Sequence, residues 1–420
     1  MLIAAIFVMP AGASAAQIVP GEVVVQYEDP ATGKAPSPAE AAPVVLQVDN
    51  VQRALEQLRA KSNVAYAVPN LIAHAAGSAS FMPNDPELGS LQWNFVGPYG
   101  VRAPQAWANA IAAGRAGGRG TIIAVIDSGV AYSNRSPFHR APDFKTGQFK
   151  RGWDYVDGDP YPNDENGHGT HVAGTIAQAT NNRKYFAGLA YGAKIMPIRA
   201  LDRAGYGDSN AISKAVRYAV DHGADLINLS LEFDSGTRAK DIPELIAAFK
   251  YARQRGVLVV AASGNEGAAQ VSYPARATGV MAVGSTTQHG CVSEFSNGGS
   301  GLDIVAPGGG LDAEDTGESR CNPNSLNLRE ISQVGFRSEG TFSHVASLSR
   351  FTVQGMDGTS MATPHVVAAA ALVIASGVIG SNPSPARIEQ QLQETARDFG
   401  SPGSDRRYGA GLLDAAAATR

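Results

Sequence analysis

The chain lacks a large net charge, abundant cysteine and, after its N-terminus, any apolar run as long as a transmembrane helix. Its 34 Lys and Arg offset 38 Asp and Glu, so the formal net charge is only -4. Neither a nucleic-acid-binding protein nor a membrane-surface protein is indicated. The two cysteines, Cys291 and Cys321, allow one disulfide, which an oxidising compartment would favour; two unpaired structural thiols are the alternative.

Hydrophobic residues make up 44% of the 420 residues and charged residues 17%. This balance is typical of a globular protein with a large buried core. Glycine is abundant, with 47 residues. We therefore predict many tight turns, as in an enzyme whose site is built from loops on a rigid scaffold.

Residues 1–15, MLIAAIFVMPAGASA, are an apolar run that ends in the small-x-small sequence Ala13-Ser14-Ala15. This pattern is typical of a secretory signal peptide. The usual basic residues at its start are missing, so an apolar N-terminal strand is the alternative. We predict export and an extracellular protein.

Residues 16–80 are predicted to form a small α+β unit and a linker. Strand patterns cover Glu22–Tyr27, Val44–Val48 and Val64–Val68, and a helical pattern starts at Val51. So short a unit is a marginal domain that needs a partner surface to fold well. The Ala, Gly and Ser residues that follow, from Ala75 on, have linker composition.

From Asn84 onward, strand and helix patterns alternate. The strand patterns are Thr121–Ile126, Lys194–Arg199, Asp225–Leu229, Val257–Ala261 and Val280–Val283, and amphipathic helical patterns cover residues 209–222 and 242–255. The predicted fold is therefore doubly wound α/β, with a mostly parallel sheet flanked by helices. Sites in such folds lie beyond the carboxyl ends of the strands.

Three motifs carry candidate chemistry. Asp127 ends a predicted buried strand in AVIDSG, His168 stands between glycines in NGHGTHVAG, and Ser360 opens an apolar helical segment in GTSMATPH. Each residue alone would more often be structural, as a helix cap or a satisfied polar group. His168 and His171 could also form an H-x-x-H metal pair, but no further His or Cys follows at zinc-ligand spacing, and His171 is expected to be a packing residue.

Taken together, in the order Asp, His, Ser, these motifs resemble those of the subtilisin-like serine proteases, in particular the thermitase-like branch. The resemblance includes VAASGNEG around Asn265 and runs to the end of the chain. It implies a subtilisin-like catalytic domain over residues 81–420, a secreted serine endopeptidase. Residues 16–80 would be its inhibitory propeptide and cleavage linker, removed by self-processing. An unrelated domain that stays attached is the alternative.

The chemistry of these residue types agrees with the resemblance. His168 can act as general base for Ser360, and Asp127 can hold the imidazole in the required tautomer. A serine at a helix N-terminus has free N–H groups near the developing oxyanion, and the Asn265 amide would complete the oxyanion hole.

Two calcium sites are predicted. Between the Asp127 and His168 motifs, clustered carboxylates with no Lys or Arg from position 154 to 164 repel one another unless a cation binds; a solvated acidic loop is the alternative. Resemblance to a family calcium loop assigns as ligands Asp154, Asp157, Asp159, Asn163 and the Tyr161 carbonyl. The second site rests on resemblance alone and comprises Asp85, Asp143 and either Asn181 or Asn182.

Substrate contacts are expected from Leu201–Gly207, including Gly205, Tyr206 and Gly207, as an edge strand that pairs with the peptide. The predicted pocket walls are Ser230, Leu231, Ala262, Ser263 and Gly264. Glu232 stands where many relatives have Gly and would attract a cationic substrate side chain; a solvated Glu is the alternative.

We expect protein or peptide substrates, no nucleic acid, no stable membrane association and a monomer. The rival functions are a non-catalytic peptide-binding member of the fold and a more selective processing protease, which Glu232 would favour.

Overall fold

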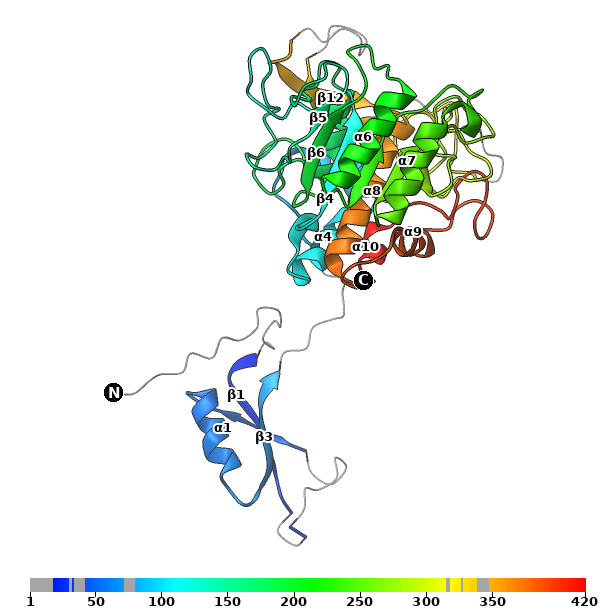
Figure 1. The fold of residues 1–420 in the computed structure, drawn as a ribbon. Helices are drawn as coiled ribbons and strands as arrows, with labels where there is room; N and C mark the ends of the chain where they lie inside the picture. The colour runs from blue at the N-terminus through cyan, green and yellow to red at the C-terminus, as the bar shows by residue number, and fades with distance from the viewer. Residues whose placement is uncertain are drawn as a thin grey trace. The chain divides into compact units, whose positions relative to one another are not determined.

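The computed structural model describes residues 18–29, 32–33, 42–71, 80–314, 318–325, 328–337 and 347–420. The chain divides into two compact units, Met1–Ser78 and Ala79–Arg420 (Figure 1). The predicted signal peptide and most of the predicted linker lie outside the described residues.

The first unit is a three-stranded antiparallel sheet with one helix. The strand order is β2-β1-β3, with β1 Ile18–Tyr27, β2 Val44–Gln47 and β3 Val64–Leu71. Helix α1, Val51–Arg59, begins at Asn50, whose side chain accepts a hydrogen bond from the Arg53 N–H at 2.9 Å. Its small core contains Val23, Val25, Leu55, Leu58 and Ala67.

The second unit is built on a seven-stranded sheet of order β10-β9-β8-β7-β4-β6-β5, in which every neighbouring pair is parallel. The prediction of a doubly wound α/β fold is confirmed. The strands are β4 Ile122–Asp127, β5 Trp153–Asp154, β6 Lys194–Arg199, β7 Leu226–Leu229, β8 Leu258–Ala262, β9 Val280–Thr286 and β10 Ile304–Pro307.

Helices cover both faces of this sheet. Strand β4 shows why, since Ile123 and Val125 join one hydrophobic core and Ala124 and Ile126 join the other. The first core also contains α4 (Ala103–Ala112), α5 (His168–Ala177), α8 (Thr359–Ser376), α9 (Pro385–Glu394) and α10 (Ala415–Ala418). On the opposite face, α6 (Ser209–Asp221) and α7 (Pro243–Gln254) lie side by side (Figure 1).

Helix α8 runs through the first core. Among the described residues it is the one helix long and apolar enough to cross a membrane, but 83% of that stretch is buried inside the unit. It is therefore a core helix. Its last turn ends at Gly377, which adopts a left-handed φ of 71° and so stops the helix.

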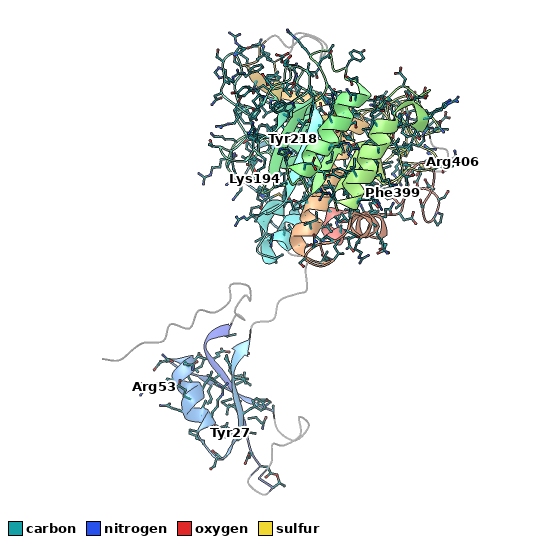
Figure 2. All side chains as sticks on the ribbon, in the orientation of Figure 1. Tyr27, Arg53, Lys194, Tyr218, Phe399 and Arg406 are labelled. Carbon is teal, nitrogen blue, oxygen red and sulfur yellow. A yellow bond between two sulfur atoms is a disulfide. The ribbon has the colours of Figure 1, made fainter. Side chains whose placement is uncertain are left out.

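Sequence patterns missed several elements, most of them short. These are the helices α2 (Glu87–Ser90), α3 (Trp93–Val96), α4, α9 and α10, two 3-10 turns (Ala116–Gly118, Ala239–Asp241), the strand β10 and the hairpin of β11 (Ile331–Phe336) and β12 (Phe351–Met356). The edge strand β5 has only two residues. It is held to α6 by Tyr218 (Figure 2), which donates a hydrogen bond to the Gly152 carbonyl oxygen at 3.1 Å and whose ring centroid lies 6.4 Å from that of Trp153.

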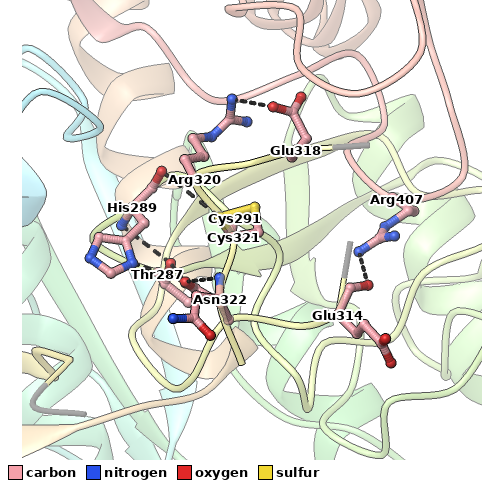
Figure 3. The surroundings of a disulfide bond; sticks show 10 residues. Thr287, His289, Cys291, Glu314, Glu318, Arg320, Cys321, Asn322 and Arg407 are labelled. Carbon is pink, nitrogen blue, oxygen red and sulfur yellow. Dashed lines mark hydrogen bonds and ion pairs between the residues drawn. A yellow bond between two sulfur atoms is a disulfide. The ribbon is translucent and has the colours of Figure 1, made fainter. Parts of the chain in front are cut away.

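The two cysteines form a disulfide. Cys291 and Cys321 have Cα atoms 5.6 Å apart (Figure 3). The buried Asp312 carboxylate stabilises the same loop, because it accepts hydrogen bonds from the Thr287 hydroxyl and the Asn322 N–H and pairs with His289. The disulfide thus closes a loop that is also anchored by polar contacts to the body of the unit.

Candidate active site

The Asp127 and His168 side chains meet at the carboxyl end of β4. Asp127 is the last residue of β4 and His168 the first residue of α5. The His168 Nδ1 atom lies 2.8 Å from Asp127 Oδ1, which also accepts the Ser128 N–H at 2.7 Å. Gly169 permits this approach, since a Cβ there would lie 2.1 Å from the Gly129 carbonyl oxygen.

The electrostatics of this pair favour a protonated imidazole. Burial lowers the pKa of His168, but the charge of Asp127 and its hydrogen bond together outweigh burial and raise the pKa above its ordinary value. The Asp127 side chain is fully buried, whereas the His168 side chain is 25% exposed. The imidazole can therefore take up a proton while one edge stays open to a substrate.

Asp164 connects the end of β4, which carries Asp127, with the loop before His168. Sequence reasoning did not predict this role, because it counted Asp164 among the carboxylates of the acidic loop. Its fully buried carboxylate accepts hydrogen bonds from the Ser128 hydroxyl, from the N–H groups of Asn166 and Gly167, and from the N–H and hydroxyl of Thr170. Burial raises the pKa of Asp164 despite these bonds. The carboxylate thereby fixes the loop before His168 against the end of β4.

Ser360 is the second residue of α8. Its hydroxyl donates to the Ser230 carbonyl oxygen at 3.2 Å, and the Ser230 hydroxyl donates to the Ser360 carbonyl oxygen at 2.8 Å. That carbonyl is available because Pro364, four residues on, has no N–H for it. Pro364 itself lies inside α8, which begins at Thr359.

Asn265 lies in the loop after β8, and its orientation is fixed. Its Oδ1 atom accepts hydrogen bonds from the Thr359 N–H at 2.8 Å and the Thr359 hydroxyl at 2.9 Å. With Oδ1 held in this way, the side-chain nitrogen Nδ2 donates to Glu232 Oε1 at 3.3 Å.

One cavity of about 630 Å³ brings together most of the predicted catalytic and substrate-binding residues. Its lining includes His168, Ser360, Gly205, Tyr206, Gly207, Ser230, Leu231 and Glu232. Sequence reasoning missed several lining residues, among them Phe233, Asp234 and Glu266, whose positions just after Glu232 and Asn265 could have suggested them.

Two predictions about substrate contacts differ from the structure. Residues 201–207 form a turn closed by the hydrogen bond from the Asp202 N–H to the Tyr206 carbonyl oxygen at 2.7 Å, and are not assigned as a strand. Ala262 and Ser263, predicted as pocket walls, are buried, and among the described residues that line the cavity neither they nor Gly264 occurs. Gly264 instead packs directly against the Glu232 carboxylate. A side chain at position 264 would not fit there, since its Cβ would lie 2.4 Å from Glu232 Oε2.

The acidic loop already holds a cation from the chain itself, which corrects the argument that nothing there offsets its charge. The guanidinium of Arg199, at the end of β6, pairs with Asp154 at 3.0 Å, with Asp157 at 2.7 Å and with Glu165 at 3.0 Å. Arg199 lies outside the 154–164 segment in sequence, and the parallel pairing of β5 with β6 places it beside Asp154.

The other predicted ligands of this loop are also engaged within the chain. Asp159 Oδ1 accepts the Tyr161 N–H at 2.8 Å, and Asn163 Oδ1 accepts the Ser133 hydroxyl at 2.7 Å. The Asn163 amide lies 3.5 Å from the Tyr161 carbonyl oxygen. Among the described residues of this loop, the predicted ligands thus already have partners within the chain, and their carboxylates form no group of three that could hold a metal ion.

The second predicted calcium site assembles residues far apart in sequence. Asp85 accepts hydrogen bonds from the N–H groups of Asn181 and Asn182, and Asp143 accepts the Asn182 amide at 2.8 Å. Asp85 and Asp143 are both buried. Burial raises the pKa of Asp143 to about 6, and the charge of Asp85 adds to this. Two buried carboxylates supply the charged part of a donor set that suits calcium. The oxygens of the two Asn side chains accept the N–H groups of Asn84 and Lys184.

Among the described residues, no group of three or more His, Cys, Asp and Glu side chains is arranged as a metal site. The second site has only two carboxylates, so amide, carbonyl or water oxygens would have to complete it. The zinc alternative also fails to gain support, because the His171 Nε2 atom is bound to the Ile331 carbonyl oxygen at 2.9 Å. Burial lowers the pKa of His171 to about 3.

Comparison with known proteins gives consistent results. The profile of the subtilase family matches residues 118–411. The chain is 34% identical over 406 residues to the thermophilic serine proteinase of Bacillus sp. (strain AK1), covering 93% of this chain and 86% of the relative. It is 36% identical to thermitase of Thermoactinomyces vulgaris, covering 77% and 95%. A protease structure from Pseudoalteromonas arctica PAMC 21717 superposes with a TM-score of 0.64 at 29% identity, covering 80% of this chain and 98% of that one.

Proposed function

Because this chain belongs to the subtilase family of serine peptidases, we propose that it is a secreted endopeptidase that cuts protein substrates through an acyl-enzyme formed on Ser360. The observation that carries the proposal is the 2.8 Å contact of His168 with Asp127 at the mouth of the cavity that Ser360 also lines. A binding-only protein has no need of these groups in one place.

In the proposed reaction, the Ser360 hydroxyl turns from the Ser230 carbonyl oxygen toward His168, which removes its proton as Ser360 attacks the substrate carbonyl. The raised pKa of His168 suits it to hold that proton and to return it to the leaving amine. Asp127 Oδ1 accepts the Nδ1–H, which leaves Nε2 as the basic nitrogen. The Asn265 amide and the N–H groups at the start of α8 then stabilise the oxyanion.

Calcium belongs to the proposal at one site only. Asp85 and Asp143, with an oxygen of either Asn181 or Asn182, would hold the ion, which would neutralise two buried carboxylates and tie the loop after Thr180 to the segment near Asn84. At Asp154, Asp157 and Asp159 we do not propose an ion, because Arg199 supplies the positive charge.

We further propose that residues 16–80 are a propeptide that inhibits the enzyme until it is cut away. Support comes from the exposed apolar side chains of the first unit, with Val44, Val45, Tyr66 and Val68 each at least 40% exposed. Such a surface is typical of a protein that folds against a partner. The Cys291–Cys321 disulfide supports an oxidising, extracellular location.

Intact mass spectrometry of the full chain, with and without Ser360→Ala, tests this proposal. The wild-type chain should lose an N-terminal fragment that ends near residue 80, cleave casein and react with a serine-directed inhibitor. The variant should stay whole and lose turnover by roughly a millionfold, as subtilisin does without its nucleophile. Casein cleavage by Ser360→Ala would exclude the proposed triad. If the wild-type chain cleaves casein but keeps its N-terminal fragment, self-processing is excluded and the proposed peptidase activity still stands.

A further inference from the structure

The carboxylate of Glu232 occupies an unusual position for a catalytic cavity. It lies against Asn265, the proposed oxyanion donor: Glu232 Oε1 is 3.1 Å from the Asn265 backbone nitrogen and 3.3 Å from the side-chain nitrogen Nδ2. The second oxygen lies 3.3 Å from the same backbone nitrogen. Thr359 holds the other end of the Asn265 amide, so this side chain cannot turn its nitrogen away from Glu232 without losing those bonds.

The cavity around Glu232 is acidic. Asp234 and Glu266 line it too, and none of the described residues in its lining is Lys or Arg. The positive charge nearest the chemistry would be His168, and only while it holds a proton. Glu232 itself therefore lacks a partner cation in this lining. Burial is the main reason why the pKa of its carboxyl group is raised, and the charge of Glu266 raises it further.

Accepting that Ser360, His168 and Asn265 act as proposed above, we propose that Glu232 selects substrates with arginine or lysine as the residue whose carbonyl is attacked, and that the bound cation frees the Asn265 amide for the oxyanion. The side chain of that residue leaves the substrate one atom from the attacked carbonyl. It therefore starts beside Asn265 Nδ2, within easy reach of a carboxylate 3.3 Å from that nitrogen.

The coupling follows from charge. When the substrate is neutral, the oxyanion forms next to an uncompensated carboxylate that competes for the same N–H group. A guanidinium or ammonium group paired with Glu232 cancels that repulsion and draws the carboxylate toward itself. The preference should therefore appear in kcat as well as in KM, which a merely attractive surface charge would not produce.

The test compares two peptide anilides that differ only in arginine or citrulline, its neutral isostere, at this position. The full chain after self-processing should prefer arginine by about ten- to a hundredfold in kcat/KM, with part of the preference in kcat. Glu232→Gln should bring this preference close to one and raise kcat for the citrulline peptide. Glu266→Gln is the matched control, since it removes the same charge from the same cavity, and it should retain most of the preference.

Each other outcome has a distinct meaning. Equal cleavage of the two peptides by the wild-type enzyme would overturn the inference and leave the proposed function intact. An equal loss of preference in Glu266→Gln would also overturn it, because the charge of the whole cavity would then be responsible. A preference expressed in KM alone would overturn the coupling to Asn265. If no peptide is cut and a serine-directed inhibitor does not label Ser360, the proposed function itself fails.

Discussion

Replacing Arg199 by methionine should lower the free energy of unfolding of the catalytic unit by about 3–5 kcal/mol. The magnitude follows from the burial of its three partners. Asp154 is 1% exposed, so the substitution leaves a buried carboxylate without its partner cation, which is the costly case. Asp157 is 59% exposed and Glu165 29% exposed, and solvent screening leaves each of these pairs at about 1 kcal/mol or less.

Chemical denaturation measures this loss, in a Ser360→Ala background so that self-digestion does not interfere. Arg253→Met is the matched control. Arg253 pairs with Glu389 through both guanidinium nitrogens, at 2.7 and 3.0 Å, but its side chain is 36% exposed. Its removal should cost about 1 kcal/mol or less. An Arg199→Met/Asp154→Asn double variant should be less destabilised than the sum of the two single variants, because the two side chains interact directly.

The same measurement in excess calcium and in excess chelator separates the two cations. If Arg199 is the structural cation, calcium should raise the free energy of unfolding of Arg199→Met more than that of the wild-type protein. Only in the variant are the loop carboxylates left without their arginine partner and so able to bind the ion. If Arg199→Met and Arg253→Met are equally stable, the guanidinium does not neutralise this loop.

Two further predictions concern the oxyanion donor and the second calcium site. Asn265→Ala should lower kcat by about a hundred- to a thousandfold with little change in KM, which is the loss seen when subtilisin itself loses its oxyanion amide. Steady-state assays measure both constants, and a change confined to KM would instead make Asn265 a substrate-binding residue. Because burial raises the folded-state pKa of Asp143 to about 6, above its ordinary value near 4, the folded chain binds more protons in that window, and the free energy of unfolding in chelator should fall as the pH rises through it. Asp143→Asn should remove this dependence and calcium should reverse its sign; identical pH profiles for wild type and variant would show that Asp143 stays ionised when folded.

Sequence patterns predicted five of the seven strands of the central sheet, because these five are buried on both faces, whereas the equally buried β10 was missed. Strand β6 was predicted with the observed bounds, Lys194–Arg199, and β4 was displaced by one residue. A buried parallel strand is a continuous run of Val, Ile and Ala bounded by Gly or polar residues, which is a strong local signal. The two-residue β5 and the β11–β12 hairpin carry no such signal, since their pairing depends on partners distant in sequence.

The side chains with the clearest motifs, Asp127, His168 and Ser360, were predicted as catalytic from sequence because each stands in a short local pattern. Their mutual distances were not, and neither was the contact of Glu232 with Asn265, whose positions are 33 residues apart. The acidic loop shows the difference most clearly. Its sequence reports four aspartates and no basic residue between positions 154 and 164, and local reasoning therefore supplies an external ion.

By itself, the sequence determined the α/β class, the order of the motifs and the residue types available for catalysis, because these depend on local periodicity and composition. Only the tertiary structure decided which charges meet. Pairing of β5 with β6 brings Arg199 to Asp154, a residue 45 positions earlier. The fold also buries Asp164 against Thr170 and the loop before His168, away from the other aspartates of its segment. Electrostatic energy depends on distance in space, and distance in space between remote segments is set by the fold and not by their spacing along the chain.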